Sequence, residues 1–220
     1  MSSTRQTYDK ALEDLQREIL RLGSLVEAAI DEAVHSLAKQ DAKLAQRVID
    51  GDEAIDNLKR EIEDKCMILI ATQQPIAKDL RRIGTAFGII TDLERMGDHA
   101  TDIAKITLRL ANEPLIKPLI DIPRMAKLAQ NMVRSVLDSY VNADIELAQK
   151  ACSKDDEIDH LYRQVFDELL EIMQRDPRTV VQGTHLLLVA RYLERIADHA
   201  TNIGEGVLYL ETGERKDLNL

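Results

Sequence analysis

The chain has 220 residues, of which 45% are apolar, so it can bury a substantial core in one large domain or two small ones. Aromatic residues make up only 3% and tryptophan is absent, so that core must be aliphatic. A formal net charge of −10 repels phosphate backbones and argues against nucleic acid as a partner, and the scarcity of Gly and Pro is typical of long helices.

Apolar residues of the first half recur at helical spacing. They predict a long helix that ends near Gln40, a short helix that Asp41 caps, and a second long helix that restarts at Gly51-Asp52. Pro75 then marks the start of a third long helix.

The second half repeats this scheme, with helices expected at residues 122–142, 144–153, 155–175 and 179–211. No segment shows the sustained alternation that is typical of strands. The expected fold class is therefore all-α, a tandem duplication of two antiparallel three-helix bundles, each with a short extra helix.

An internal duplication supports this division. Residues 93–103 and 193–203 are identical at eight of eleven positions, at an offset of 100, and residues 41–64 match 144–167 at an offset of 103. A period near 100 is too long for a solenoid repeat. It predicts two copies of one small domain, residues 1–113 and residues 114–220.

No apolar run approaches the roughly 18 residues that a membrane-spanning helix needs, and the first ten residues are polar. The two cysteines, Cys66 and Cys152, form no CxxC pair and lie within helical patterns. We therefore expect reduced thiols and a cytoplasmic protein with no direct membrane span.

Acidic side chains follow one edge of the apolar stripe on the third helix of each half. At about 100° per residue, two facing helices bring four or five oxygen-bearing side chains to one groove. The candidate metal ligands are Glu94, Asp98, Asp102, Asp52 and Asp56 in the first half, and Glu194, Asp198, Asn202, Asp155 and Asp159 in the second.

Such a groove is costly without a counter-charge. Like charges one turn apart destabilise a helix, and carboxylates beside an apolar stripe are expensive to desolvate. A bound cation would offset both costs; all-oxygen sites suit Mg, Ca or Mn, and carboxylates also bind Fe and Zn. The alternative is a set of solvated carboxylates paired with Arg95, Arg195 or Lys105.

Two further pairs of residues recur beside these acids. His99 and His199 point about 160° away from the core direction, which predicts exposed or weakly hydrogen-bonded rings, with support of a metal ligand as the alternative. Gly97 and Ala197 lie on the packed face, where close approach of two helices explains their small size.

These motifs resemble those of the PhoU family of phosphate-signalling proteins. The resemblance rests on Leu-Glu-Arg-x-x-Asp-His-Ala at 93–100 and 193–200, on the Asp pairs at 52/56 and 155/159, and on Gln-Gln-Pro-Ile-Ala-Lys-Asp-Leu-Arg at 73–81. It covers almost the whole chain. It implies multinuclear sites for divalent or trivalent metal ions (Fe, Zn, Mn or Mg) at the acidic motifs, and an accessory role in place of catalysis.

The resemblance also implies partners. Family members link a phosphate ABC transporter, here expected through its ATPase subunit, to a sensor histidine kinase, and they act as negative regulators of the phosphate-starvation response of the Pho regulon. They act at the cytoplasmic face of the inner membrane and often form homodimers. One departure is Asn202, which stands where the first half has Asp102 and lowers the negative charge of the second site.

Two other functions stay open at this point. A carboxylate-bridged di-metal enzyme would use Glu-x-x-His pairs on two helices, and we expect no such site, so no catalytic residue is predicted. A metal-free interaction protein, whose acidic ridges bind Arg or Lys of a partner, is compatible with the composition.

Overall fold

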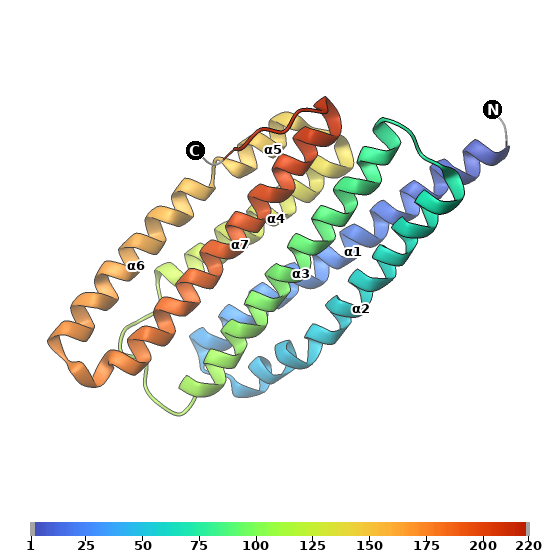
Figure 1. Ribbon diagram of the computed structural model, residues 1–220. Coiled ribbons are helices and arrows are strands. Elements are labelled where there is room, and N and C mark those ends of the chain that lie inside the picture. Colours follow the sequence, from blue (N-terminus) through green and yellow to red (C-terminus); the bar gives the residue numbers. More distant parts are fainter. Residues whose placement is uncertain (1–2, 219–220) are drawn as a thin grey trace.

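A computed structural model describes residues 3–218, with side chains from Tyr8 onward, and among these residues there are helices but no strand (Figure 1). The expected all-α fold of two antiparallel three-helix bundles is confirmed. The elements are α1 (Ser3–Lys39), α2 (Ala42–Gln73), α3 (Lys78–Leu110), α4 (Asp121–Asn142), α5 (Ile145–Cys152), α6 (Asp155–Arg175), the 3-10 helix η1 (Pro177–Thr179) and α7 (Val180–Thr212).

Local signals set several of these boundaries. Asp41 caps α2 by accepting hydrogen bonds from the backbone N–H groups of Lys43 and Leu44, both at 3.0 Å, and Asp144 caps α5 in the same way. The residue before each cap, Gln40 or Ala143, adopts a left-handed conformation that ends the preceding helix.

Two boundary predictions were wrong. The first repeat has no separate short helix, because α2 runs without a break through Gly51-Asp52. Buried Val48 and Ile55 on either side keep one packed face continuous, and that packing outweighs the low helix propensity of one glycine. Pro75 lies in the linker before α3 and does not start that helix.

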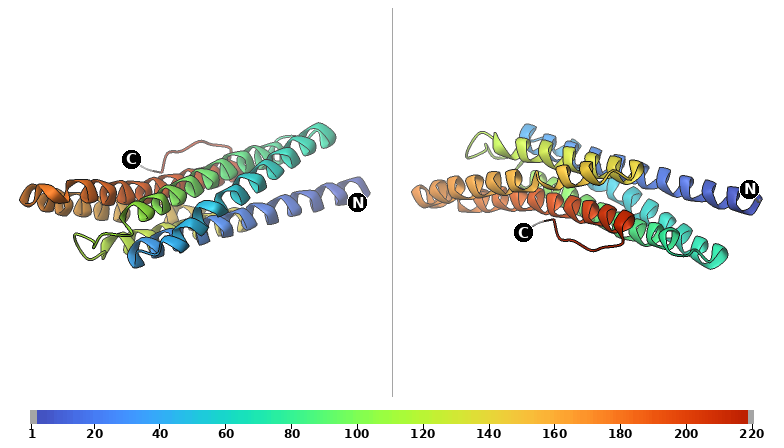
Figure 2. Two further views of the ribbon diagram at one scale, coloured as in Figure 1. Left: turned by 90° about the horizontal axis from the view of Figure 1, so that it is seen from below. Right: turned by 90° about the horizontal axis from the view of Figure 1, so that it is seen from above.

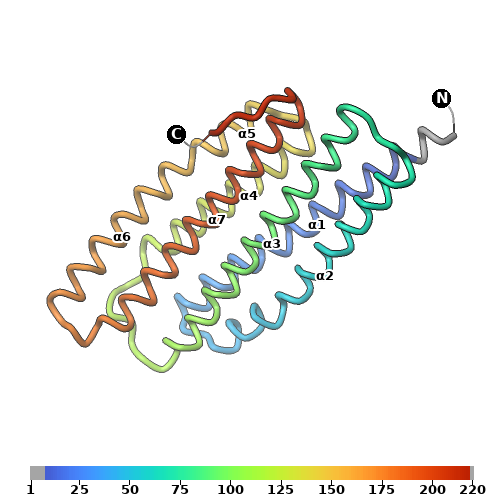
Figure 3. Tube along the Cα trace, viewed as in Figure 1, coloured from blue at the N-terminus to red at the C-terminus, as the bar shows by residue number. Residues whose placement is uncertain are grey.

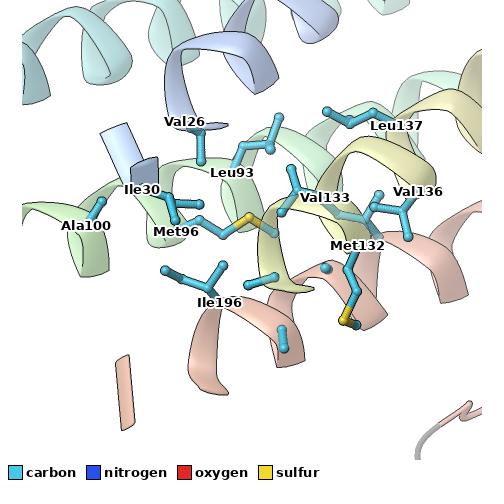
Figure 4. Close-up of a cluster of buried hydrophobic side chains, with 14 of the residues drawn as sticks. Val26, Ile30, Leu93, Met96, Ala100, Met132, Val133, Val136, Leu137 and Ile196 are labelled. Carbon is cyan, nitrogen blue, oxygen red and sulfur yellow. The ribbon is translucent and has the colours of Figure 1, made fainter. Parts of the chain in front are cut away.

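The two bundles share one hydrophobic core. Helix α3 packs against α7, and α1 packs against α4, so buried side chains form a single cluster across both repeats. Figure 4 shows Ile30 of α1, Met96 of α3, Val133 of α4 and Ile196 of α7 meeting in it. The expected boundary at 113/114 falls in the linker between α3 and α4, but the core continues across it.

The molecule is long and flat as a result. The views from below and above show the helices lying nearly along one direction (Figure 2), and the trace in Figure 3 places α2 and α6 at opposite edges with α3 and α7 between them. Each acidic motif therefore lies on a central helix, next to an outer helix of its own repeat.

Candidate functional site

The acidic residues of the first repeat come together where α2 runs beside α3. Asp52 Oδ1 of α2 accepts a hydrogen bond from Thr101 Oγ1 of α3 at 3.1 Å, which joins the two helices at this point. The charges of Asp52 and Asp56 act on Asp98, and that of Asp56 also acts on Glu94. The predicted groove between these helices thus forms with four of its five acidic members.

Burial makes these carboxylates harder to ionise. The pKa of Glu94 is raised by desolvation and next by the charge of Asp98, and the pKa of Asp98 is raised by desolvation and next by the charge of Asp52. The guanidinium of Arg95 opposes both shifts. Each negative charge in this cluster makes ionisation of its neighbours less favourable, and a bound cation would relieve that repulsion.

The second repeat places its acids deeper. Glu194 of α7 is 8% exposed, and desolvation, followed by the charge of Asp198, raises its pKa to about 7. The charge of Asp159 on α6 reaches it as well. Asp155, at the start of α6, is buried. Glu194 Oε2 is buried and has no hydrogen-bond partner among the described residues, while Oε1 accepts from Arg191.

Basic side chains neutralise most of these acids in the structure. The two pairs on the central helices are Arg95–Asp98 at 3.3 Å and Arg195–Asp198 at 3.0 Å, and Arg60–Asp56 and Arg163–Asp159, both at 3.3 Å, lie on the outer helices. This is the paired arrangement that the sequence left as the alternative to a metal site.

No group of three His, Cys, Asp or Glu side chains within the described part of the chain is arranged to hold a metal ion. Arg95 and Arg195 are 59% and 42% exposed, so both can swing away from the acids at little packing cost. The donor set is all oxygen, the kind that suits a hard cation, and Glu194 Oε2 is a buried oxygen without a hydrogen-bond partner among the described residues. Metal ligation by these residues stays a prediction.

Asp102 and Asn202 lie apart from the other candidates. Asp102 pairs with Lys105 at 3.0 Å, and its charge acts on His99 and Tyr192 instead of on the acidic cluster. Asn202 Nδ2 donates to Asp92 Oδ1 at 3.2 Å, across the contact between the repeats. Neither residue lies with the acidic cluster of its repeat, and ligation of a metal by either one stays a prediction.

The histidines were predicted to be exposed or weakly hydrogen-bonded: neither ring is exposed, and the buried Nδ1 of His99 has no hydrogen-bond partner among the described residues. His199 Nδ1 lies 2.9 Å from Asp92 Oδ1, and His99 stacks on Tyr192 with ring centroids 5.4 Å apart. Burial, followed by the nearby His199, lowers the pKa of His99 to about 4. The face opposite each bundle's own core is covered because α3 packs against α7.

Sequence reasoning also missed two Glu-x-x-His spacings, Glu32/His35 on α1 and Glu157/His160 on α6. Both histidines are exposed, and Glu157 pairs with Arg124 at 2.9 Å. Since these pairs do not project into a shared core, they do not form the di-metal arrangement of carboxylate-bridged enzymes.

Fold and site together define a class: duplicated all-helical proteins in which each repeat carries an acidic cluster between its central helix and an outer helix. Comparison with known proteins identifies the family to which the chain belongs. The sequence model described as the PhoU domain matches residues 19–107 and again residues 122–207. The chain belongs to the PhoU family.

Relatives match along nearly their whole length. A phosphate-specific transport system accessory protein PhoU homolog of Clostridium acetobutylicum is 45% identical, over 98% of this chain and 99% of the relative, and one from Aquifex aeolicus is 43% identical over 93% of each. The crystal structure of PhoU from Pseudomonas aeruginosa aligns with a TM-score of 0.90 at 34% identity, covering 94% of this chain and all of that one. The phosphate transport system regulatory protein PhoU from Streptococcus pneumoniae aligns at 0.89 and 34%, over 96% and 99%.

Proposed function

We propose that this chain is an accessory and regulatory protein of a phosphate transport system, and that its two acidic clusters bind metal ions. The names of relatives up to 45% identical support the first part. The proposal of metal binding rests mainly on the convergence of carboxylates from α2 and α3, which is repeated in α6 and α7. Glu194 adds a buried oxygen without a hydrogen-bond partner among the described residues.

In this proposal the protein's own residues act as a clamp. A bound Fe, Zn, Mn or Mg ion would supply positive charge between the carboxylates. Asp52 and Asp56 on α2 then hold that helix against Glu94 and Asp98 on α3, and Asp155 and Asp159 do the same for α6 and α7. The clamp fixes the angle between the outer and central helices, and with it the shape of the surfaces that partners contact.

The proposed partners are the phosphate ABC transporter, through its ATPase subunit, and a sensor histidine kinase. By linking them, the protein would act as a negative regulator of the phosphate-starvation response. No described helix is both long and apolar enough to cross a membrane. We propose that a homodimer acts at the cytoplasmic face of the inner membrane through these partners, without catalysis.

Elemental analysis tests the metal sites. The native protein, purified without a His-tag or chelator, should carry near-stoichiometric metal that an Asp98→Ala/Asp198→Ala variant lacks. Asp138→Ala, on the exposed face of α4, is the matched control and should keep the metal. Equal metal content in the double variant and the control, or no metal in any of the three, would rule the sites out.

A metal-free adaptor is the second candidate, favoured by the arginines that already neutralise Asp98 and Asp198. The two functions separate in a pull-down of the transporter ATPase with and without chelator. Loss of binding in chelator supports the clamp, and unchanged binding together with absent metal supports the adaptor.

A further inference from the structure

A groove of about 610 Å³ runs between the first half of α3 and the second half of α7, and none of Glu94, Asp98, Glu194 and Asp198 lines it. Thr85 and Ile89 of α3 and Ile203 and Gly206 of α7 line it. The chain after α7 turns back at Gly213 and runs along the end of that helix (Figure 1), so that residues 215–217 form part of the wall.

Two glycines of α3 open this groove. Gly84 and Gly88 lie one turn apart, and a Cβ atom added to either would meet no described atom within 4 Å. Glycine is the least favourable helix residue after proline. Close packing within the chain does not require these two, in contrast to Gly97, where an added Cβ would lie 3.1 Å from Ile55.

The duplication provides an internal comparison. At an offset of 100, Leu188 and Tyr192 stand where the first repeat has Gly88 and Asp92, and Ile106 stands where the second has Gly206. The fold therefore accepts large side chains at these places, and the opposite end of the α3–α7 pair has them. The glycines that line this groove, Gly84, Gly88 and Gly206, all lie at this one end of the α3–α7 pair.

A buried hydroxyl at the groove lacks a partner. Thr85 is 7% exposed, and its Oγ1 has no hydrogen-bond partner within residues 3–218. Thr91 Oγ1 donates to Phe87 O and Thr184 Oγ1 donates to Val180 O, both at 2.8 Å, whereas the buried Thr201 Oγ1 of α7 also lacks a partner among the described residues. A buried donor without an acceptor is costly, and of these two threonines only Thr85 is part of the groove wall.

Charge along the groove is polarised. Arg81 lies at the end where α3 begins, near Leu210 O at 3.5 Å, and Arg215 lies over the ring of Tyr209 at that same end, with Lys216 next in the wall. Asp92 and Glu205 line the other end, but Asp92 is already bonded to His199 and Asn202, and Glu205 accepts from the backbone N–H of Leu218. Lys216 pairs with Glu214 at 3.5 Å and Asp217 also lines the groove, so the charges left without an ion pair within residues 3–218 at the basic end are those of Arg81 and Arg215.

We propose that this groove is the docking site for an amphipathic helix of a partner protein, with a narrow apolar face and acidic residues at the end that meets Arg81, Arg215 and Lys216. Glycines one turn apart let a second helix approach closely, as small residues do at tight helix crossings. From Arg81 to Asp92, α3 offers about 16 Å of contact, or three turns. The groove would serve the adaptor role proposed above, yet its test requires no metal.

The probe is a fluorescein-labelled helical peptide of about 16 residues, roughly 24 Å long, with an Ala/Leu face and three glutamates in its first turn. A second peptide carries glutamine in place of those glutamates. Fluorescence anisotropy with the full chain should show saturable binding of the glutamate peptide and weaker binding of the glutamine peptide. The Arg81→Gln/Arg215→Gln variant should bind the two peptides with equal affinity, because it lacks the guanidinium groups that attract the glutamates.

Filling the groove gives the decisive comparison. Gly88→Leu should weaken binding by about tenfold or more, since leucine occupies the space for the docking helix. Gly51→Leu is the matched control, because its added Cβ also meets no described atom, but on α2. Circular dichroism and metal content of both variants should equal those of the native protein. Peptide binding then tests the groove and metal content tests the metal sites, so the failure of one proposal is distinguished from the failure of the other.

Three results would overturn the proposal. The first is equal peptide affinity of the native protein and Gly88→Leu. The second is no saturable binding of either peptide to the native protein. The third is a native dimer that Gly88→Leu converts to a monomer in sedimentation, which would assign the groove to a second copy of this chain.

Discussion

His199 Nδ1 in α7 lies 2.9 Å from Asp92 Oδ1 in α3, so a carboxylate of the first repeat holds the histidine beside the acidic cluster of the second. Asn202 donates to the same oxygen at 3.2 Å. The equivalent contact in the other direction is the stack of His99 on Tyr192, since Tyr192 occupies the position of Asp92. Both histidines thus join the central helices of the two repeats.

Asp92→Ala should lower the free energy of unfolding by about 1 to 3 kcal/mol, because it leaves His199 and Asn202 without their shared acceptor. Urea unfolding at neutral pH measures the change. The control Asp138→Ala, on an exposed face, should stay within about 0.5 kcal/mol of the native protein. Equal stability of the two variants would mean that the contact contributes nothing.

In the metal-free protein, Glu194 should contribute a loss of stability as pH rises from about 4.5 to 7, and His99, whose pKa is lowered to about 4, should contribute a gain over the part of that range below about 6.5. Glu194 has a pKa of about 7 in the fold, against 4.5 for an ordinary glutamate, so in this range the folded state keeps a proton that the unfolded state has lost. Glu194→Gln removes this proton uptake, so the stability of the variant relative to the native protein should rise by about 1 to 3 kcal/mol between pH 4.5 and 7, since one pKa unit corresponds to about 1.4 kcal/mol.

Denaturant titrations in EDTA at several pH values test this expectation. Glu113→Gln, an exposed residue of the linker before α4, serves as the control and should reproduce the native slope. A Glu194→Gln profile parallel to the native one would contradict the assigned pKa.

Gly204→Ala should destabilise the protein by about 1 to 3 kcal/mol, the usual result of adding a methyl group to a filled core. The added Cβ would collide with Cys152 Sγ, where α7 crosses α5. Thermal unfolding should show partial recovery in Gly204→Ala/Cys152→Ala, which removes the colliding sulfur. Gly51→Ala, in open space, should instead stabilise α2 by up to about 1 kcal/mol.

Cys66 and Cys152 should resist thiol reagents in the native protein. Both are buried, and desolvation raises the pKa of each thiol to about 12, so almost no thiolate forms at neutral pH. Ellman's reagent should label neither cysteine until denaturant unfolds the chain, after which two thiols should react. Rapid labelling at native conditions would show that the helices open locally around these residues.

Much of the fold could be predicted because its signals are local. The helical spacing of apolar residues identified all the long helices, and Asp41 and Asp144 marked helix starts that the structure confirms. The predicted break at Gly51 was wrong because the helix is maintained there by tertiary packing. Val48 and Ile55 are buried on either side of Gly51, and the presence of a glycine in the sequence does not show that packing.

The candidate site was predictable in part. That α2 and α3 bring Asp52, Asp56, Glu94 and Asp98 together follows from the helical periodicity of two neighbouring helices. The basic partners Arg60, Arg163 and Arg191 were missed, although each lies three or four residues from its acid on the same helix, a spacing at which opposite charges pair.

The sequence by itself determined the helices, the duplication and the acidic ridge of each repeat, since each depends on residues within a few turns or on a neighbouring helix. Only the tertiary structure decided which faces of the two bundles meet. Packing of α3 on α7 depends on side chains about 100 positions apart, whose complementarity no local pattern encodes. That packing buries His99 and His199, takes Asn202 to Asp92, and leaves the groove beside Gly84 and Gly88 open.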